Sequence, residues 1–238
     1  MPSLPKGTSI AQRDGVEARA ELRGGDILDY YTIEGHCTAE EIIKKSQFIV
    51  NCFHVENEGK VEEILKSIQK EHYKATHNCY AYVLGREKET QKHNDDGEPS
   101  GTAGKPILES ILHNGLTNIL IIVTRYFGGI KLGAGGLVRA YSGTATLGIN
   151  QSTHVKMQYS SLMEISCEYT NLGKIKDYLA KNQIKEEEAI YDDKVRIHAY
   201  IPISDEEKIQ QDLVELTNDQ VGVCKMREEY VKQIISKN

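Results

Sequence analysis

The segment Ile119–Arg139 reads ILIIVTRYFGGIKLGAGGLVR and contains three different patterns in succession. Ile119–Thr124 is apolar on both faces, which predicts a central strand of a sheet. Tyr126–Gly136 carries five glycines and predicts a loop, and the small residues of Leu137–Leu147 predict a helix. The segment therefore predicts a buried strand that leads through a glycine-rich loop into a helix.

Upstream of this segment, short strands and amphipathic helices are expected. Val61, Ile64, Leu65 and Ile68 recur at helical spacing and predict a helix with one buried face. The polar segment Arg86–Gly104 is rich in Gly, Pro, Asp and Asn, and predicts a long functional loop without regular structure. The other expected elements are the strands Tyr31–Ile33, Gln47–Phe53 and Asn78–Leu84, and a helix that begins at Pro106, covers Ile107–Leu112 and is ended by Gly115.

Downstream, the composition changes near Gln151–His154, which indicates a second domain. Its elements follow the order βαββαβ, which predicts a ferredoxin-like unit in a chain of the α+β class. We therefore predict a flexible extension at residues 1–28 and domains at 29–152 and 153–238. The expected elements are strand Met157–Tyr169, helix Leu172–Asn182, strands Ile184–Tyr191 and Val195–Ile203, helix Asp205–Thr217 and strand Val221–Val231.

Composition limits the classes of protein to consider. The chain has 238 residues, a formal net charge of −6, 39% hydrophobic and 27% charged residues, which is typical of a folded protein. Its longest aliphatic run is far shorter than the roughly 20 residues that span a bilayer, and no secretory signal is expected. The five cysteines are scattered and form neither a disulfide framework nor a CxxC metal motif, so we expect a cytoplasmic protein.

Charge is distributed unevenly along the chain. The 54 residues of Ser110–Met163 contain no acidic residue, whereas 35 acids in 238 residues would place about eight there. The same segment contains the cations Arg125, Lys131, Arg139 and Lys156. We expect a local positive surface that binds anions.

The glycine loop is the first candidate site. Glycines let the backbone present consecutive N–H groups to an anion, and the following helix N-terminus adds partial positive charge. The alternative is that the glycines only permit close packing of helix on strand; the spacing fits neither a Walker loop nor a GxGxxG turn. The predicted anion- or RNA-binding residues are Arg125, Lys131, Arg139, Gly128, Gly129, Gly133, Gly135 and Gly136.

Two further sets of residues carry possible chemistry. Asp95, Asp96 and Glu98 could hold a cation, but their spacing is not that of an EF-hand, and a structured loop facing a partner is favoured. Cys79 and His77 could form a nucleophile pair, although no oxyanion motif accompanies them. The tyrosines near these loops could stack on bases or anchor the core: Tyr73, Tyr80, Tyr82 and Tyr126.

Three long motifs resemble the YigZ/IMPACT family: ATHNCYAYVLG at 75–85, NDDGEPSGTAGKPILE at 94–109 and VTRYFGGIKLGAGGLVRAYS at 123–142. The resemblance covers about residues 29–150, and the remaining tail resembles the C-terminal domain of the bacterial members. It implies a first domain like domain 2 of ribosomal protein S5 and a second like the ferredoxin-like C-terminal domain of elongation factor G. The eukaryotic members regulate translation, but this sequence lacks their RWD domain, so that role is not carried over.

The family's distinctive positions fall in the two loops already singled out. The resemblance lends no catalytic residue, metal or cofactor, and none is expected. It adds a set of residues in a loop that faces a partner: His77, Asn78, Asp95, Asp96, Glu98, Ser100 and Thr102.

The leading hypothesis is a non-enzymatic protein that contacts RNA, the ribosome or a translation factor through the Arg125–Arg139 surface. One rival is a nucleotide-binding enzyme of the GHMP-kinase type, because Leu132–Gly136 loosely resembles the kinase glycine loop and Asp95 with Asp96 could hold Mg²⁺. The other rival is a pure protein-interaction module. The sequence leaves the choice between RNA and protein, and the oligomeric state, open.

Overall fold

The computed structural model describes residues 29–235, so the predicted flexible extension at 1–28 lies outside the described residues. The chain forms two compact units. Among the described residues, the N-terminal unit comprises Tyr30–Met157 and 232–235, and the C-terminal unit comprises Asp29 and Gln158–Val231. The chain passes from one unit to the other within a strand, between Met157 and Gln158.

A five-stranded antiparallel sheet forms the centre of the N-terminal unit, in the order β2-β3-β6-β4-β5. The middle strand is β6, and Ile119–Val123 within it is fully buried, as predicted for a segment that is apolar on both faces. The strands of this unit are β1 (Tyr30–Ile33), β2 (His36–Ile43), β3 (Ser46–His54), β4 (His77–Leu84), β5 (Thr90–Asn94) and β6 (Ile119–Tyr126).

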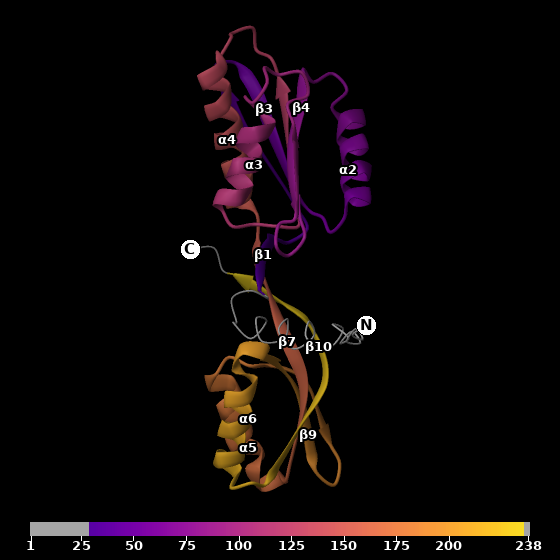
Figure 1. The fold of residues 1–238 in the computed structure, drawn as a ribbon, viewed down its shortest axis with the longest axis vertical. Coiled ribbons are helices and arrows are strands. Elements are labelled where there is room, and N and C mark those ends of the chain that lie inside the picture. Colours follow the sequence, from indigo (N-terminus) through magenta and orange to yellow (C-terminus); the bar gives the residue numbers. More distant parts are fainter. Residues whose placement is uncertain (1–28, 236–238) are drawn as a thin grey trace, which may run out of the picture. The chain divides into compact units, whose positions relative to one another are not determined.

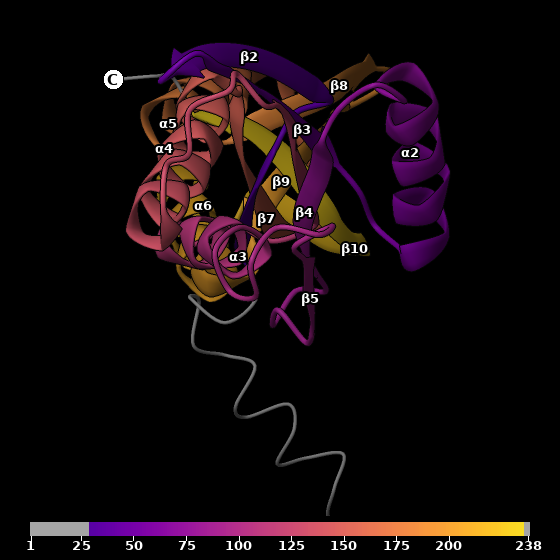
Figure 2. The same ribbon diagram turned by 90° about the horizontal axis from the view of Figure 1, so that it is seen from above.

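Helices cover both faces of this sheet, with α2 (Glu58–Glu71) on one face and α3 (Gly104–His113) and α4 (Ala134–Gln151) on the other (Figures 1 and 2). The predicted periodicity of α2 is confirmed, because Val61 and Ile68 pack with Leu120 and Ile122 of β6. The alternate residues of β6, such as Ile121, belong to the core shared with α3 and α4. Each face of β6 therefore contributes to a separate hydrophobic core.

The prediction that Arg86–Gly104 has no regular structure is wrong in part. Thr90–Asn94 forms β5, an edge strand that pairs antiparallel with β4. Its side chains are almost all exposed, so its sequence lacks the apolar alternation that identifies a strand. The other edge strand, β2, was not predicted either, because acidic residues interrupt its alternation.

The C-terminal unit has the predicted element order βαββαβ and the strand order β10-β7-β9-β8. Helices α5 and α6 pack against one face of its sheet, where Ile175 and Leu213 contact core residues of β7 and β9. Together the two units make an α+β protein with two sheets. The elements are β7 (His154–Cys167), α5 (Tyr169–Lys181), β8 (Lys185–Tyr191), β9 (Val195–Pro202), the 3-10 helix η1 (Ile203–Asp205), α6 (Glu206–Thr217) and β10 (Val221–Ile235).

Four connections meet at one end of the N-terminal unit, here called the loop end. The strand registers require this, because Gln47 at the start of β3 and His77 at the start of β4 both lie opposite the last residues of β6. Both α3 and α4 begin at this end, and the β6–α4 loop is at the top of Figure 1. The loop end consists of the turn 44–45, the segment 72–76, the polar loop 95–103 and the glycine loop 127–133.

Candidate functional site

The glycine loop is shorter than predicted, since α4 begins at Ala134 and takes Gly135 and Gly136 into its first turn. Gly133 is the N-cap residue with φ 75°, a conformation that favours glycine, and no side chain from residues 29–235 caps the helix. The first turn contains no acidic residue. The N-terminal N–H groups of α4 are therefore available to an anion at an exposed position.

Gly128 has a structural role that the sequence left open. A Cβ atom at this position would lie 1.9 Å from the carbonyl oxygen of Lys45. The Gly128 N–H also donates to Ser46 Oγ at 3.2 Å. The glycine loop is therefore packed directly against the turn between β2 and β3.

Arg125 does not face solvent, and the prediction that it clamps an external anion is wrong. Its side chain is 6% exposed, and Nη1 donates to Glu98 Oε1 at 2.5 Å. The guanidinium carbon lies 5.4 Å from the ring centroids of both Phe48 and Phe127. Burial between two rings leaves the charge to be balanced by the Glu98 carboxylate, so Arg125 is a structural residue.

Glu98 is likewise buried and does not face a partner. Its side chain is 4% exposed, and Oε1 also accepts a hydrogen bond from the Tyr141 hydroxyl at 2.9 Å. The His77 ring approaches the same oxygen at 3.9 Å. Burial chiefly, with the Cys79 and Glu98 neighbours, raises the pKa of Tyr141 far above its usual range, so its hydroxyl stays protonated and donates.

Lys131 and Arg139 lie on the surface as predicted, and within residues 29–235 neither takes part in an ion pair. Two more exposed cations, Lys44 and Lys45, lie in the turn that Gly128 contacts. The sequence analysis missed this pair, because only the fold brings the turn beside the glycine loop. These four residues, here called the basic surface, replace the predicted set that included Arg125.

The polar loop is held by its own acidic side chains. Asp95 Oδ1 accepts from the N–H groups of Ala103 and Gly104 at 3.0 and 2.8 Å, and Oδ2 accepts from Gly101 at 2.8 Å. Burial alone would raise the pKa of Asp95, but these amide bonds outweigh it and hold the pKa below its usual range. Asp95 therefore caps the start of α3 and has little capacity left for a cation.

The remaining residues of the predicted partner-facing loop divide between interior and surface. Asp96 and Ser100 are exposed, whereas Asn78 and Thr102 are buried. Asp96 Oδ2 accepts from the Asn78 N–H at 2.6 Å, and the half-buried His77 binds the Asp96 carbonyl through Nδ1 at 2.7 Å. Most of this loop thus binds the rest of its own unit, and only its tip reaches solvent.

Cys79 does not meet the requirements of a nucleophile. It is fully buried, and burial raises the pKa of its thiol to about 12, against the opposing effect of the Tyr141 hydroxyl. Its Sγ donates to the carbonyl of Asp95 at 3.0 Å. The interpretation of Cys79 as a small buried residue is confirmed.

The tyrosines have different positions. Tyr82 is 5% exposed and packs in the α2 core, while Tyr126 is half-buried and its hydroxyl lies 3.0 Å from His72 Nδ1. Tyr73 is 74% exposed. Only Tyr73 of these three is therefore open to a ligand over most of its ring.

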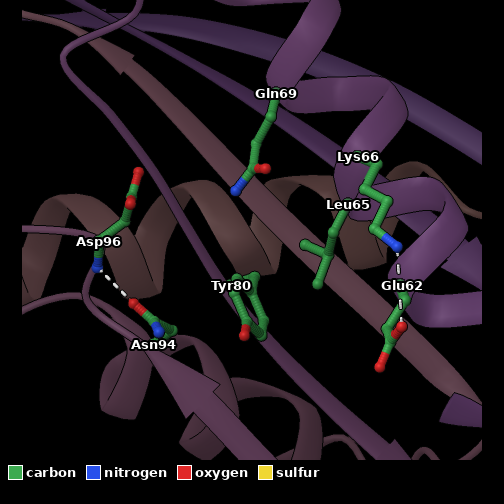
Figure 3. Close-up of a pocket in the computed structure, with 7 residues that line it drawn as sticks. All are labelled: Glu62, Leu65, Lys66, Gln69, Tyr80, Asn94 and Asp96. Carbon is green, nitrogen blue, oxygen red and sulfur yellow. Dashed lines mark hydrogen bonds and ion pairs between the residues drawn. The ribbon is translucent and has the colours of Figure 1, made fainter.

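A groove of about 240 Å³ lies between α2 and the β4–β5 hairpin, and no pattern in the sequence predicts it. In Figure 3, Tyr80 lies between the side chains of α2 and the pair Asn94–Asp96, in which Asn94 Oδ1 accepts from the Asp96 N–H at 2.7 Å. Among its lining residues, Asp96 and Tyr80 were candidates from the sequence. The groove is lined by Glu62, Leu65, Lys66, Gln69, Tyr80, Asn94 and Asp96.

Metal sites and membrane spans are two further classes of feature to consider. In the part of the chain from 29 to 235, no group of His, Cys, Asp and Glu is arranged to hold a metal ion. No helix within that part is long and apolar enough to cross a bilayer.

Comparison with known proteins gives matches over most of the chain. Residues 44–149 match the Impact N-terminal domain, and residues 165–220 match a domain of unknown function (DUF1949). A crystal structure of a hypothetical protein aligns with 84% of this chain and 98% of its own, with a TM-score of 0.54 and 30% identity.

Two bacterial relatives are similar over more than half of the chain. IMPACT family member YvyE of Bacillus subtilis (strain 168) is 39% identical over 207 residues, which cover 87% of this chain and 95% of YvyE. IMPACT family member YigZ of Escherichia coli (strain K12) is 38% identical over 146 residues, 60% of this chain and 72% of YigZ. With two family domains in order and a relative matched over almost its whole length, the chain belongs to the IMPACT family.

Proposed function

We propose that this protein is a non-enzymatic, cytoplasmic protein that contacts RNA, on the ribosome or in a translation complex, through the basic surface of its loop end. The observation that carries the proposal is the composition of that surface: Lys44, Lys45, Lys131 and Arg139 are exposed beside an uncapped helix N-terminus. Phosphate groups are the anions that such cations and free N–H groups bind.

The fold assignments belong to the same proposal. The strand order β10-β7-β9-β8 and the element order of the C-terminal unit support a ferredoxin-like fold. For the N-terminal unit, a sheet with helices on both faces and a glycine loop before α4 supports the fold of domain 2 of ribosomal protein S5. Both likenesses are to proteins of the translation machinery, which is an argument by analogy for the same setting.

The geometry of Asp95 argues against the kinase alternative, which requires a Mg²⁺ site in the polar loop. A Mg²⁺ site in the polar loop would need free carboxylate oxygens, yet both oxygens of Asp95 accept backbone hydrogen bonds. A protein partner has a specific observation in its favour, since Ile130 and Val138 expose 41% and 38% of their surface beside the basic surface. A pull-down from lysate with and without nuclease separates a bound protein from a protein held through RNA.

The direct test is a salt titration of RNA binding, measured by fluorescence anisotropy. If Lys131 and Arg139 contact phosphates, Lys131→Ala and Arg139→Ala should each weaken binding and reduce the slope of log K against log salt by about 0.7. The matched control is Lys60→Ala, an exposed lysine at the start of α2 paired with Glu63, which should leave the slope unchanged. Equal slopes for all four proteins would contradict the proposal.

A further inference from the structure

Two large aromatic side chains are exposed at the loop end, although burial is their usual state. Tyr73 is 74% exposed and Phe127 is 47% exposed. Tyr73 lies in the segment that follows α2, and Phe127 is the first residue of the glycine loop. The two segments are hydrogen-bonded to each other, because the Phe127 N–H donates to Thr76 Oγ1 at 3.0 Å.

Each ring lies beside a cation. The Arg125 guanidinium lies 5.4 Å from the ring centroid of Phe127, and Lys74 Nζ lies 5.5 Å from that of Tyr73. Arg125 is itself fixed by Glu98, so the Phe127 ring rests on a rigid, buried group while much of its surface remains open. A ring held in place costs little entropy when a ligand stacks on it.

The basic surface adjoins these rings along the chain and through contacts. Lys131 follows Phe127 in the same loop, and the Lys45 carbonyl contacts Gly128, the residue after Phe127. Exposed aromatic rings between cations are the arrangement that binds single-stranded nucleic acid, where the bases stack and the phosphates meet the cations. A duplex keeps its base faces stacked inside and offers only phosphates and groove edges.

We propose, resting on the proposed function above, that the loop end binds single-stranded RNA with bases stacked on Tyr73 and Phe127. The phosphates on either side of these bases lie at the basic surface. The inference names the form of RNA and assigns two stacking residues. Base stacking would explain why these two rings are exposed, because an exposed ring adds little to the packing of the unit.

The test compares a labelled ten-nucleotide uridine strand with a ten-base-pair RNA duplex at 50 mM salt, by fluorescence anisotropy. We expect the single strand to bind more tightly, and Tyr73→Leu and Phe127→Leu each to weaken it by about five- to a hundred-fold, as loss of one stacked base predicts. Tyr191→Leu is the matched control, because Tyr191 is 53% exposed but lies in the C-terminal unit. It should bind as the unchanged protein does.

A second measurement needs no variant. A single strand that carries 2-aminopurine should lose fluorescence on binding, because stacking on an aromatic ring quenches this base, and the chain has no tryptophan to interfere. Single-strand binding without quenching, with both leucine variants within twofold of the unchanged protein, would overturn the stacking and leave the proposed function standing. Equal affinity for the duplex would also overturn it. Binding to neither RNA would remove both proposals.

Discussion

Replacing Glu98 by glutamine tests whether a buried ion pair joins the polar loop to β6. The Glu98 side chain is 4% exposed and that of Arg125 is 6% exposed. Glutamine keeps the size and one acceptor oxygen for the Tyr141 hydroxyl, but it leaves the guanidinium charge without a counter-charge. Loss of one partner of a buried pair costs about 3–5 kcal/mol, so we expect the free energy of unfolding to fall by about that amount.

Urea unfolding followed by circular dichroism measures the effect, and hydrogen exchange of the β6 amides assigns it to the N-terminal unit. The matched control is Glu109→Gln, which breaks an exposed pair with Lys105 at 3.8 Å and should change stability by about 0.5 kcal/mol at most. A double variant, Glu98→Gln with Arg125→Met, should recover part of the loss, because no buried charge remains. A loss below about 1 kcal/mol for Glu98→Gln would refute the reasoning, since it would mean that Arg125 is solvated.

Three further predictions concern single side chains. Gly128→Ala should lower the free energy of unfolding in urea by about 1–3 kcal/mol, because its Cβ would overlap a carbonyl of the β2–β3 turn. In contrast, a Cβ at Gly135 would have no atom within 4 Å, so Gly135→Ala should stabilise α4 by about 0.5–1 kcal/mol. Asp95→Asn should cost about 1–2 kcal/mol at neutral pH. Burial raises the pKa of Asp95, but hydrogen bonds from backbone amides lower it by more, so the net shift is downward. The contribution of the Asp95 carboxylate to stability is therefore present above pH about 4 and is lost as pH falls, and the stabilities of Asp95→Asn and the unchanged protein should converge in acid. The pKa of His198 is raised, chiefly by its hydrogen bond to Glu164. Its contribution to the free energy of unfolding is therefore present below pH about 6.5 and is lost as pH rises through the raised pKa. An NMR titration should show the raised pKa, and His198→Gln should abolish this pH dependence of stability.

The elements with strong internal patterns could be predicted from the sequence. Ile119–Thr124 could be identified as a central strand because both of its faces are apolar, and α2 because its apolar residues recur at helical spacing. Edge strands β2 and β5 could not, since their pairing depends on backbone hydrogen bonds to a neighbour rather than on buried side chains.

The position of Arg125 shows why the site was harder to predict than the fold. In β6 it is in phase with Ile121 and Val123, which face the α3 and α4 core, but β6 is buried on both faces, so its period does not say that Arg125 is inside. Its partner Glu98 comes from a loop remote in sequence, and no local pattern links the two. Likewise, the turn that contains Lys44 lies beside the glycine loop because of a tertiary contact, which no local sequence pattern indicates.

The acidic residues of the polar loop explain how the loop end is basic although the loop itself is rich in acids. Asp95 is used as a helix cap, and Glu98 is used to neutralise the buried Arg125. Both carboxylates therefore act inside the unit, and Asp96 is left as the exposed acid of the loop. Lys131 and Arg139 have no such internal partner in the described part of the chain, so their charge is directed to solvent. The charge of Glu98 is paired inside the N-terminal unit, so substitutions at Glu98 should chiefly alter stability. The charge of Lys131 is exposed to solvent, so substitutions at Lys131 should alter salt-dependent binding alone.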